Sequence, residues 1–272
     1  MNDTFLKACR GEKTDYTPLW LMRQAGRFLP QYRKVSERYG FLTMCRTPEL
    51  AAEVTLQPVD VLGVDAAIFF SDILTTVVPM GMDLRYDEEK GPSFANPIRT
   101  VADVERLTVP DPEEALAFVY QAQKILAREL VRKVPLIGFA GGPFTVAAYM
   151  IEGSSSHTFS KVKTFVFTQP EAFRSLMDKV SRLTASYLKM QARAGANALM
   201  IFDSFAGVLG PQDYLDFNLP YLKDIINEIR NTGVPIIYFG LGQHGNFPAL
   251  AGCGADVIGI DYNVTLDDAI AR

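Results

Sequence analysis

The chain has 272 residues, of which 48% are hydrophobic and 21% charged, a globular balance that supports one large core. Its formal net charge of −4 argues against nucleic acid as the main ligand, because a phosphate backbone calls for a basic surface. The N-terminus does not resemble a signal peptide, no apolar run is long enough to cross a bilayer, and the 3 cysteines are scattered, so we expect a cytoplasmic protein without disulfides, membrane segments or bound metal.

Six short apolar runs predict the strands of a buried parallel sheet. They do not alternate polar with apolar residues, which is typical of strands that are covered on both faces. In chain order the predicted strands are residues 18–22, 65–70, 135–140, 198–202, 235–239 and 256–261.

Helical patterns separate several of these runs, at residues 49–62, 112–132, 170–195 and 211–230. The repeated order of strand, loop and helix predicts a parallel sheet with right-handed crossovers. We interpret the chain as a single α/β domain over residues 1–272. A closed (β/α)8 TIM barrel has eight strands, so six runs indicate either an open sheet or such a barrel with about six of its eight units present. The long connection before residue 112 predicts a loop or small hairpin over one end of the barrel.

Functional groups of such barrels lie where the strands end, so the residues that follow each run are the candidates for a site. Arg23 and Arg27 directly follow the first run, in the segment RQAGR, and Gly26 gives the backbone freedom there. Two guanidinium groups four residues apart can converge on carboxylate oxygens. The alternative is a pair of surface arginines in ion pairs. Arg33 and Arg46 are candidates for a wider positive rim.

Asp72 follows the second run and lies in apolar sequence, so its carboxyl group must be paired, protonated or functional. Tyr149 lies in a third apolar segment and could equally be a core residue. Asp203 and Ser204 end the fourth run, and we expect one of them to face the mouth of the barrel. His244 is a weaker candidate because a loop histidine is the commoner outcome.

Five segments together resemble the uroporphyrinogen decarboxylase family. They cover nearly the whole chain in order. The matching segments are residues 2–33 with RQAGR, 41–74 with FFSDIL, 90–99, 135–156 with AYMIEG, and 201–211 with FDSFAG.

This resemblance implies an enzyme, a carboxy-lyase that removes CO2 from the four acetate side chains of uroporphyrinogen III. The implied product is coproporphyrinogen III, on the route to haem and other porphyrins. The family is usually homodimeric and uses neither a metal nor an organic cofactor. The implied substrate-binding residues are Arg23, Gln24, Ala25, Gly26, Arg27, Asp72, Tyr149 and Ser204. Asp72 is the implied catalytic residue, beneath the macrocycle and bonded to its pyrrole N–H groups.

Family members continue through two further strand-helix units, with a QGN-type and an LGHG segment that are not found here. We therefore expect an incomplete barrel with little activity of its own. Two alternatives remain open: a non-catalytic tetrapyrrole-binding relative, and a corrinoid- or thiol-linked methyltransferase with the same barrel and a zinc site.

Overall fold

A parallel sheet lies at the centre of the computed structural model, which describes residues 1–87 and 90–271. Within these ranges the sheet has five strands, and every neighbouring pair is parallel. In spatial order, which is also chain order, they are β1 (Ala67–Ile68), β4 (Leu136–Gly141), β5 (Ala198–Asp203), β6 (Ile236–Gly240) and β7 (Val257–Gly259). The chain thus winds in one direction, as the α/β barrel interpretation requires.

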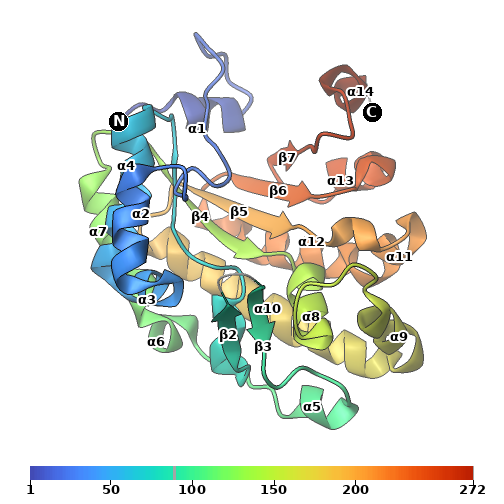
Figure 1. Ribbon diagram of the computed structural model, residues 1–272. Coiled ribbons are helices and arrows are strands. Elements are labelled where there is room, and N and C mark those ends of the chain that lie inside the picture. Colours follow the sequence, from blue (N-terminus) through green and yellow to red (C-terminus); the bar gives the residue numbers. More distant parts are fainter. Residues whose placement is uncertain (88–89, 272) are drawn as a thin grey trace.

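Helices cover the outer face of this sheet, and Figure 1 shows α4, α7, α10 and α12 following one another around it. The α-helices are α1 (Thr4–Cys9), α2 (Pro30–Tyr39), α3 (Phe41–Arg46), α4 (Pro48–Leu62), α5 (Val101–Glu105), α6 (Pro112–Ala115), α7 (Ala117–Glu129), α8 (Pro143–Glu152), α9 (Ser160–Thr168), α10 (Pro170–Ala194), α11 (Pro211–Phe217), α12 (Leu219–Ile229), α13 (Phe247–Ala251) and α14 (Leu266–Ala271). Short 3₁₀ helices are η1 (Thr75–Met80), η2 (Ala206–Val208), η3 (Arg230–Thr232) and η4 (His244–Asn246). No helix in the described ranges has the length and apolar character needed to span a bilayer.

An antiparallel hairpin, β2 (Leu84–Asp87) paired with β3 (Gly91–Phe94), forms in the long connection after β1. A bridge between Ser93 and Ser154 joins it to the end of α8. This agrees with the prediction of a small hairpin in that segment.

The predicted first strand, residues 18–22, is not a strand in the structure. The Leu19 carbonyl accepts one hydrogen bond from the amide of Asp65, just before β1, at 2.8 Å. The Leu19 amide donates instead to the Asp65 carboxylate at 2.8 Å, so a side chain replaces the second ladder bond. The segment has no regular strand structure, and Leu19 and Leu21 are exposed.

The predicted helices at 49–62 and 170–195 correspond to α4 and α10, whereas the other two each break once. The helix predicted at 211–230 divides at Asn218, because Pro220 has no amide hydrogen and clashes with the preceding turn. The helix predicted at 112–132 divides at Leu116, which has φ −125° and ψ 35°, outside the helical region.

The hydrophobic interior consists of one large core and one small core. The large core fills the space between the sheet and its helices. The small core joins α2, α3 and α4 to the end of β1, and its buried members are Leu29, Tyr32, Val35, Met44, Cys45, Val54 and Phe70. Phe70 is the last apolar residue before Ser71 and Asp72, so the small core supports the point where the chain leaves β1.

Candidate active site

The arginine-bearing loop, residues 23–27, is held in place from below by Gln24. The Gln24 side chain is fully buried, accepts a hydrogen bond from the Leu21 amide at 3.1 Å and donates one to the Ala66 carbonyl at 3.1 Å. The loop is therefore tied to the start of β1, and the Gln24 side chain forms its hydrogen bonds with the backbone of the protein. Ala25 and Gly26 are half-buried, and the Gly26 carbonyl closes the turn by accepting from Leu29.

Arg23 and Arg27 are both exposed, and neither forms an ion pair within residues 1–87 and 90–271. The surface alternative, in which they neutralise carboxylates of the protein, therefore does not apply to the described chain. Arg33 supports the loop by donating to the Arg27 carbonyl at 2.8 Å. Two unpaired guanidinium groups on an anchored loop are available for an anionic ligand.

Asp72 follows β1 and lies deep, although part of its surface still reaches solvent. Its Oδ1 accepts the Leu74 amide at 2.7 Å. Burial raises the pKa of Asp72, and the hydrogen bond from Leu74 opposes that shift. A carboxylate in this position is a fixed negative charge in a poorly hydrated place, which suits stabilisation of a nearby cation.

Two half-buried tyrosines, Tyr149 and Tyr86, adjoin these charges. Burial raises the pKa of Tyr149, the charge of Asp72 adds to that shift, and the charge of Arg23 opposes it. Tyr86 is likewise under the influence of Asp72, Arg27 and Arg23. The structure thus brings the predicted residues Arg23, Arg27, Asp72 and Tyr149 into one group. Tyr86 was not predicted, since it belongs to the hairpin rather than to the sheet.

Aromatic rings form the walls beside this group. The Tyr149 ring lies 4.8 Å from that of Phe205, which lies 4.6 Å from that of Phe159. Tyr86 stacks on Phe41 with ring centroids 4.5 Å apart. Aromatic side chains supply a large apolar surface, so the site combines exposed guanidinium groups and a largely buried carboxyl group with apolar surface.

Asp203 and Ser204 take different positions at the end of β5. Ser204 is half-buried and adjoins Phe205, whereas Asp203 is fully buried. The Asp203 carboxylate accepts hydrogen bonds from the Thr145 amide and hydroxyl, the Asn218 amide and the Tyr238 hydroxyl. Burial raises the pKa of Asp203, and these hydrogen bonds oppose the shift. The Thr145 hydroxyl also accepts from the Phe205 amide at 2.9 Å, so its own hydrogen must point at Asp203.

This Asp203 network joins the segments that follow β4, β5 and β6. Thr145 lies in the first turn of α8, the helix that carries Tyr149. Leu241 donates its amide to the Asp203 carbonyl at 3.2 Å. A Cβ at Gly142 would lie 2.5 Å from the Asp203 carboxyl carbon, so only glycine allows this approach. Asp203 therefore fixes the shape of the mouth from beneath.

We expect the Asp203→Asn variant to lose about 1–3 kcal/mol of unfolding free energy, because an amide nitrogen would face donors where a carboxylate oxygen now accepts. Urea unfolding measures this loss. The matched control is Asp224→Asn on the exposed face of α12, which should change stability by less than about 0.5 kcal/mol. If both variants lost the same unfolding free energy, the hydrogen bonds to Asp203 would not contribute to stability.

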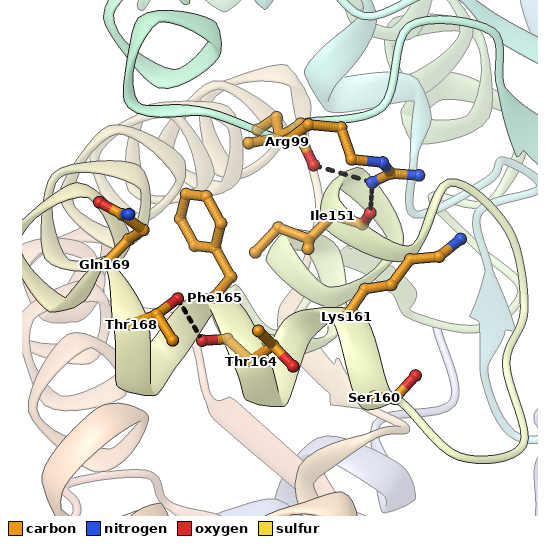
Figure 2. A pocket seen from close by; sticks show the side chains of 9 residues that line it. Arg99, Ile151, Ser160, Lys161, Thr164, Phe165, Thr168 and Gln169 are labelled. Carbon is orange, nitrogen blue, oxygen red and sulfur yellow. Dashed lines mark hydrogen bonds between the residues drawn. The ribbon is translucent and has the colours of Figure 1, made fainter.

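A separate hollow of about 310 Å³ lies between residues 98–99, the end of α8 and helix α9 (Figure 2). It is lined by Ile98, Arg99, Ile151, Ser160, Lys161, Thr164, Phe165, Thr168 and Gln169. Arg99 donates to the carbonyls of Ile98, Ile151 and Glu152, and Lys161 donates to Glu152. These cations cap the C-terminal carbonyls of α8, so their positive charge already has a structural use.

The histidines lie elsewhere. His157 is exposed in the loop between α8 and α9, and His244 is exposed at the start of η4, after β6. Across residues 1–87 and 90–271, no three His, Cys, Asp or Glu side chains are grouped so as to hold a metal ion.

Comparisons with known proteins give one consistent result. The family model described as uroporphyrinogen decarboxylase matches residues 1–272. The uroporphyrinogen decarboxylase of Trichlorobacter lovleyi is 51% identical over 269 residues, covering 99% of this chain and 78% of that protein. That of Desulfotalea psychrophila is 52% identical over 272 residues, covering 100% of this chain and 80% of that protein. A solved methyltransferase from Methanosarcina mazei superposes with a TM-score of 0.80 at 18% identity, covering 97% of this chain and 77% of that one, a likeness of fold alone.

Proposed function

The chain belongs to the uroporphyrinogen decarboxylase family, and on that premise we propose that it removes the acetate carboxyl groups of uroporphyrinogen III to give coproporphyrinogen III and CO2. It is a carboxy-lyase of porphyrin biosynthesis. The single structural observation that supports this most is the grouping of two unpaired arginines with Asp72, since a substrate with eight carboxylates and a cationic intermediate needs both charges.

The chemistry needs a place for the electrons of the broken carbon–carbon bond. A proton added to the ring carbon beside an acetate makes the pyrrole cationic, and this cation accepts those electrons as CO2 leaves. A second proton completes the methyl group and the first is returned, so each acetate exchanges its CO2 for one hydrogen. The ring itself is thus the electron sink.

Asp72 stabilises the cation in this scheme, because it is a buried negative charge that is already oriented by the Leu74 amide. Its place beneath the macrocycle also suits it to accept the pyrrole N–H groups. Arg23 and Arg27 hold carboxylates that are not reacting and so orient the ring. Tyr149 and Ser204 line the same mouth, and Phe205 provides an apolar wall.

Within this loop, Gln24, Ala25 and Gly26 contribute through position rather than through exposed side chains. Gln24 is buried and fixes the backbone, and the turn at Gly26 sets the spacing of the two arginines. We therefore propose that the segment binds substrate as a unit.

The resemblance to the family also underlies three finer proposals: that the protein works in the cytoplasm, that its product serves haem synthesis, and that it acts as a homodimer. The acidic balance of the chain favours a small-molecule ligand over nucleic acid.

The test is anaerobic incubation of the purified protein with uroporphyrinogen III, followed by oxidation and chromatography of the porphyrins. We expect products with seven, six, five and four carboxyl groups. The identity of the products, whatever the rate at which they form, decides the matter. Uroporphyrinogen that binds without any loss of carboxyl groups would favour the non-catalytic alternative.

A further inference from the structure

Tyr86 lies on β2 of the hairpin, outside the sheet that supplies the other site residues. Its place is fixed by an aromatic ladder that runs to the end of β1. The Tyr86 ring stacks on Phe41, Phe41 meets Phe70 edge-on at 5.6 Å, and Phe70 meets Tyr32 edge-on at 5.9 Å. Because Phe70 comes just before Ser71 and Asp72, this ladder fixes Tyr86 relative to the site.

The strand pairing shows how the hairpin presents this side chain. Leu84 and Tyr86 are two residues apart and so point to the same face of β2, while Arg85 points to the other. Leu84 is buried in the large core and Arg85 is exposed. Tyr86 is half-buried, and its ring packs on that of Phe41.

The charges of Asp72, Arg27 and Arg23 all affect the pKa of Tyr86, and Tyr86 in turn affects the pKa of Tyr149. In contrast to the buried tyrosines Tyr214 and Tyr238, whose hydroxyls bond to one another, the Tyr86 hydroxyl has no hydrogen-bond partner within the described residues. A polar group on an anchored ring, set among the ligand-binding charges and without a partner of its own, is available to a ligand.

We propose that Tyr86 is a further substrate-binding residue, whose hydroxyl donates a hydrogen bond to a carboxylate that Arg23 or Arg27 also holds. The proposal rests on the proposed function for the nature of the ligand. It adds a contact from the hairpin to those from the arginine loop and from α8, the helix that carries Tyr149.

The hydroxyl is a donor in this contact. Burial raises the pKa of Tyr86, the charge of Asp72 raises it further, and Arg27 opposes the shift. The net direction is upward, so the phenol stays protonated at neutral pH and meets a carboxylate with a hydrogen rather than with a negative charge.

The Tyr86→Phe variant isolates this hydroxyl, because phenylalanine keeps the stack on Phe41. We expect the KM for uroporphyrinogen III, and the Kd for the stable octacarboxylate uroporphyrin in a fluorescence titration, to rise at least about tenfold, the usual range for a hydrogen bond to a charged group. We expect kcat and the thermal midpoint to stay near those of the wild type. Tyr120→Phe, on α7 beside Lys124, removes one hydroxyl elsewhere and should change neither constant.

The results separate this proposal from the proposed function. If the wild type binds uroporphyrin but does not turn over uroporphyrinogen, the activity fails while a higher Kd in Tyr86→Phe still supports the contact. An unchanged Kd and KM in Tyr86→Phe overturn the contact, whether or not the enzyme is active. A fall in kcat with KM unchanged also overturns it, since the hydroxyl would then act on the chemical step.

Discussion

In the Asp72→Asn variant we expect kcat for uroporphyrinogen III to fall by about 10²–10³, with a much smaller change in KM. Asparagine has nearly the same shape and its oxygen can still accept the Leu74 amide. The substitution therefore removes the negative charge and also replaces one carboxylate oxygen, an acceptor for pyrrole N–H groups, by an amide nitrogen. In the proposed scheme that charge stabilises a cation that exists only during reaction, so its loss should raise the barrier more than it weakens the binding of the substrate.

The same variant should be more stable than the wild type at neutral pH. Burial raises the pKa of Asp72 in the folded protein above its ordinary value of 3.8. The folded state then binds the proton more tightly than the unfolded state, so stability falls as the pH rises through the folded pKa and stays lower above it. Asparagine cannot ionise, and the thermal midpoint at pH 7 should rise.

Activity should show the opposite dependence on pH. The wild type should lose kcat as the pH falls through the raised pKa of Asp72, whereas the residual activity of Asp72→Asn should lack this limb. Asp224→Asn serves again as the matched control and should leave kcat unaltered. If kcat of Asp72→Asn stays within a few-fold of the wild type, the role given to Asp72 is wrong.

The second large effect concerns the arginine loop. Arg23→Ala and Arg27→Ala should each weaken binding of uroporphyrin by about 1.5–3 kcal/mol, or roughly 10- to 150-fold in Kd. Both side chains are exposed and without an ion pair in the described chain, so their removal leaves no protein carboxylate unpaired and folding should be little affected.

The double variant Arg23→Ala/Arg27→Ala shows whether the two arginines bind the same carboxylate or different ones. If they hold different carboxylates, their losses should add, and if they grip the same one, the double variant should lose less than the sum. Arg132→Ala, at an exposed arginine in the turn that follows α7, makes the same change in net charge and is the control. Binding by the wild type should weaken as salt is added, and less so in the double variant. Unaltered Kd in both single variants would falsify the assignment of this loop.

Much of the sheet could be predicted because buried parallel strands are nearly continuous apolar runs, and five of the six predicted runs contain a strand. The run at 18–22 has the same composition but no regular ladder, since Asp65 satisfies the Leu19 amide with its side chain. Composition records whether a segment can be buried, not whether a second strand lies beside it.

Some residues of the candidate site could likewise be predicted from the sequence, and others could not. Arg23, Arg27 and Asp72 could be selected because each directly follows an apolar run, and strand ends converge in this fold. Tyr86 could not, because its position depends on how the hairpin folds back through Phe41 onto Phe70. Nor could the sequence assign Asp203 and Ser204 to their different roles, which depend on donors from Thr145, Asn218 and Tyr238.

The small core beneath the site has a consequence for how the protein opens. Its members Leu29 and Tyr32 follow the arginine loop, Phe70 precedes Asp72, and Phe41 packs against it while holding Tyr86. A cluster of this size, distinct from the large core, is a natural cooperative unit for partial unfolding. Backbone amides of α2 and α3 would then exchange with deuterium together, ahead of those in β4 and β5. We expect binding of substrate to slow that exchange, because one such fluctuation would displace all of the proposed ligand-binding residues together.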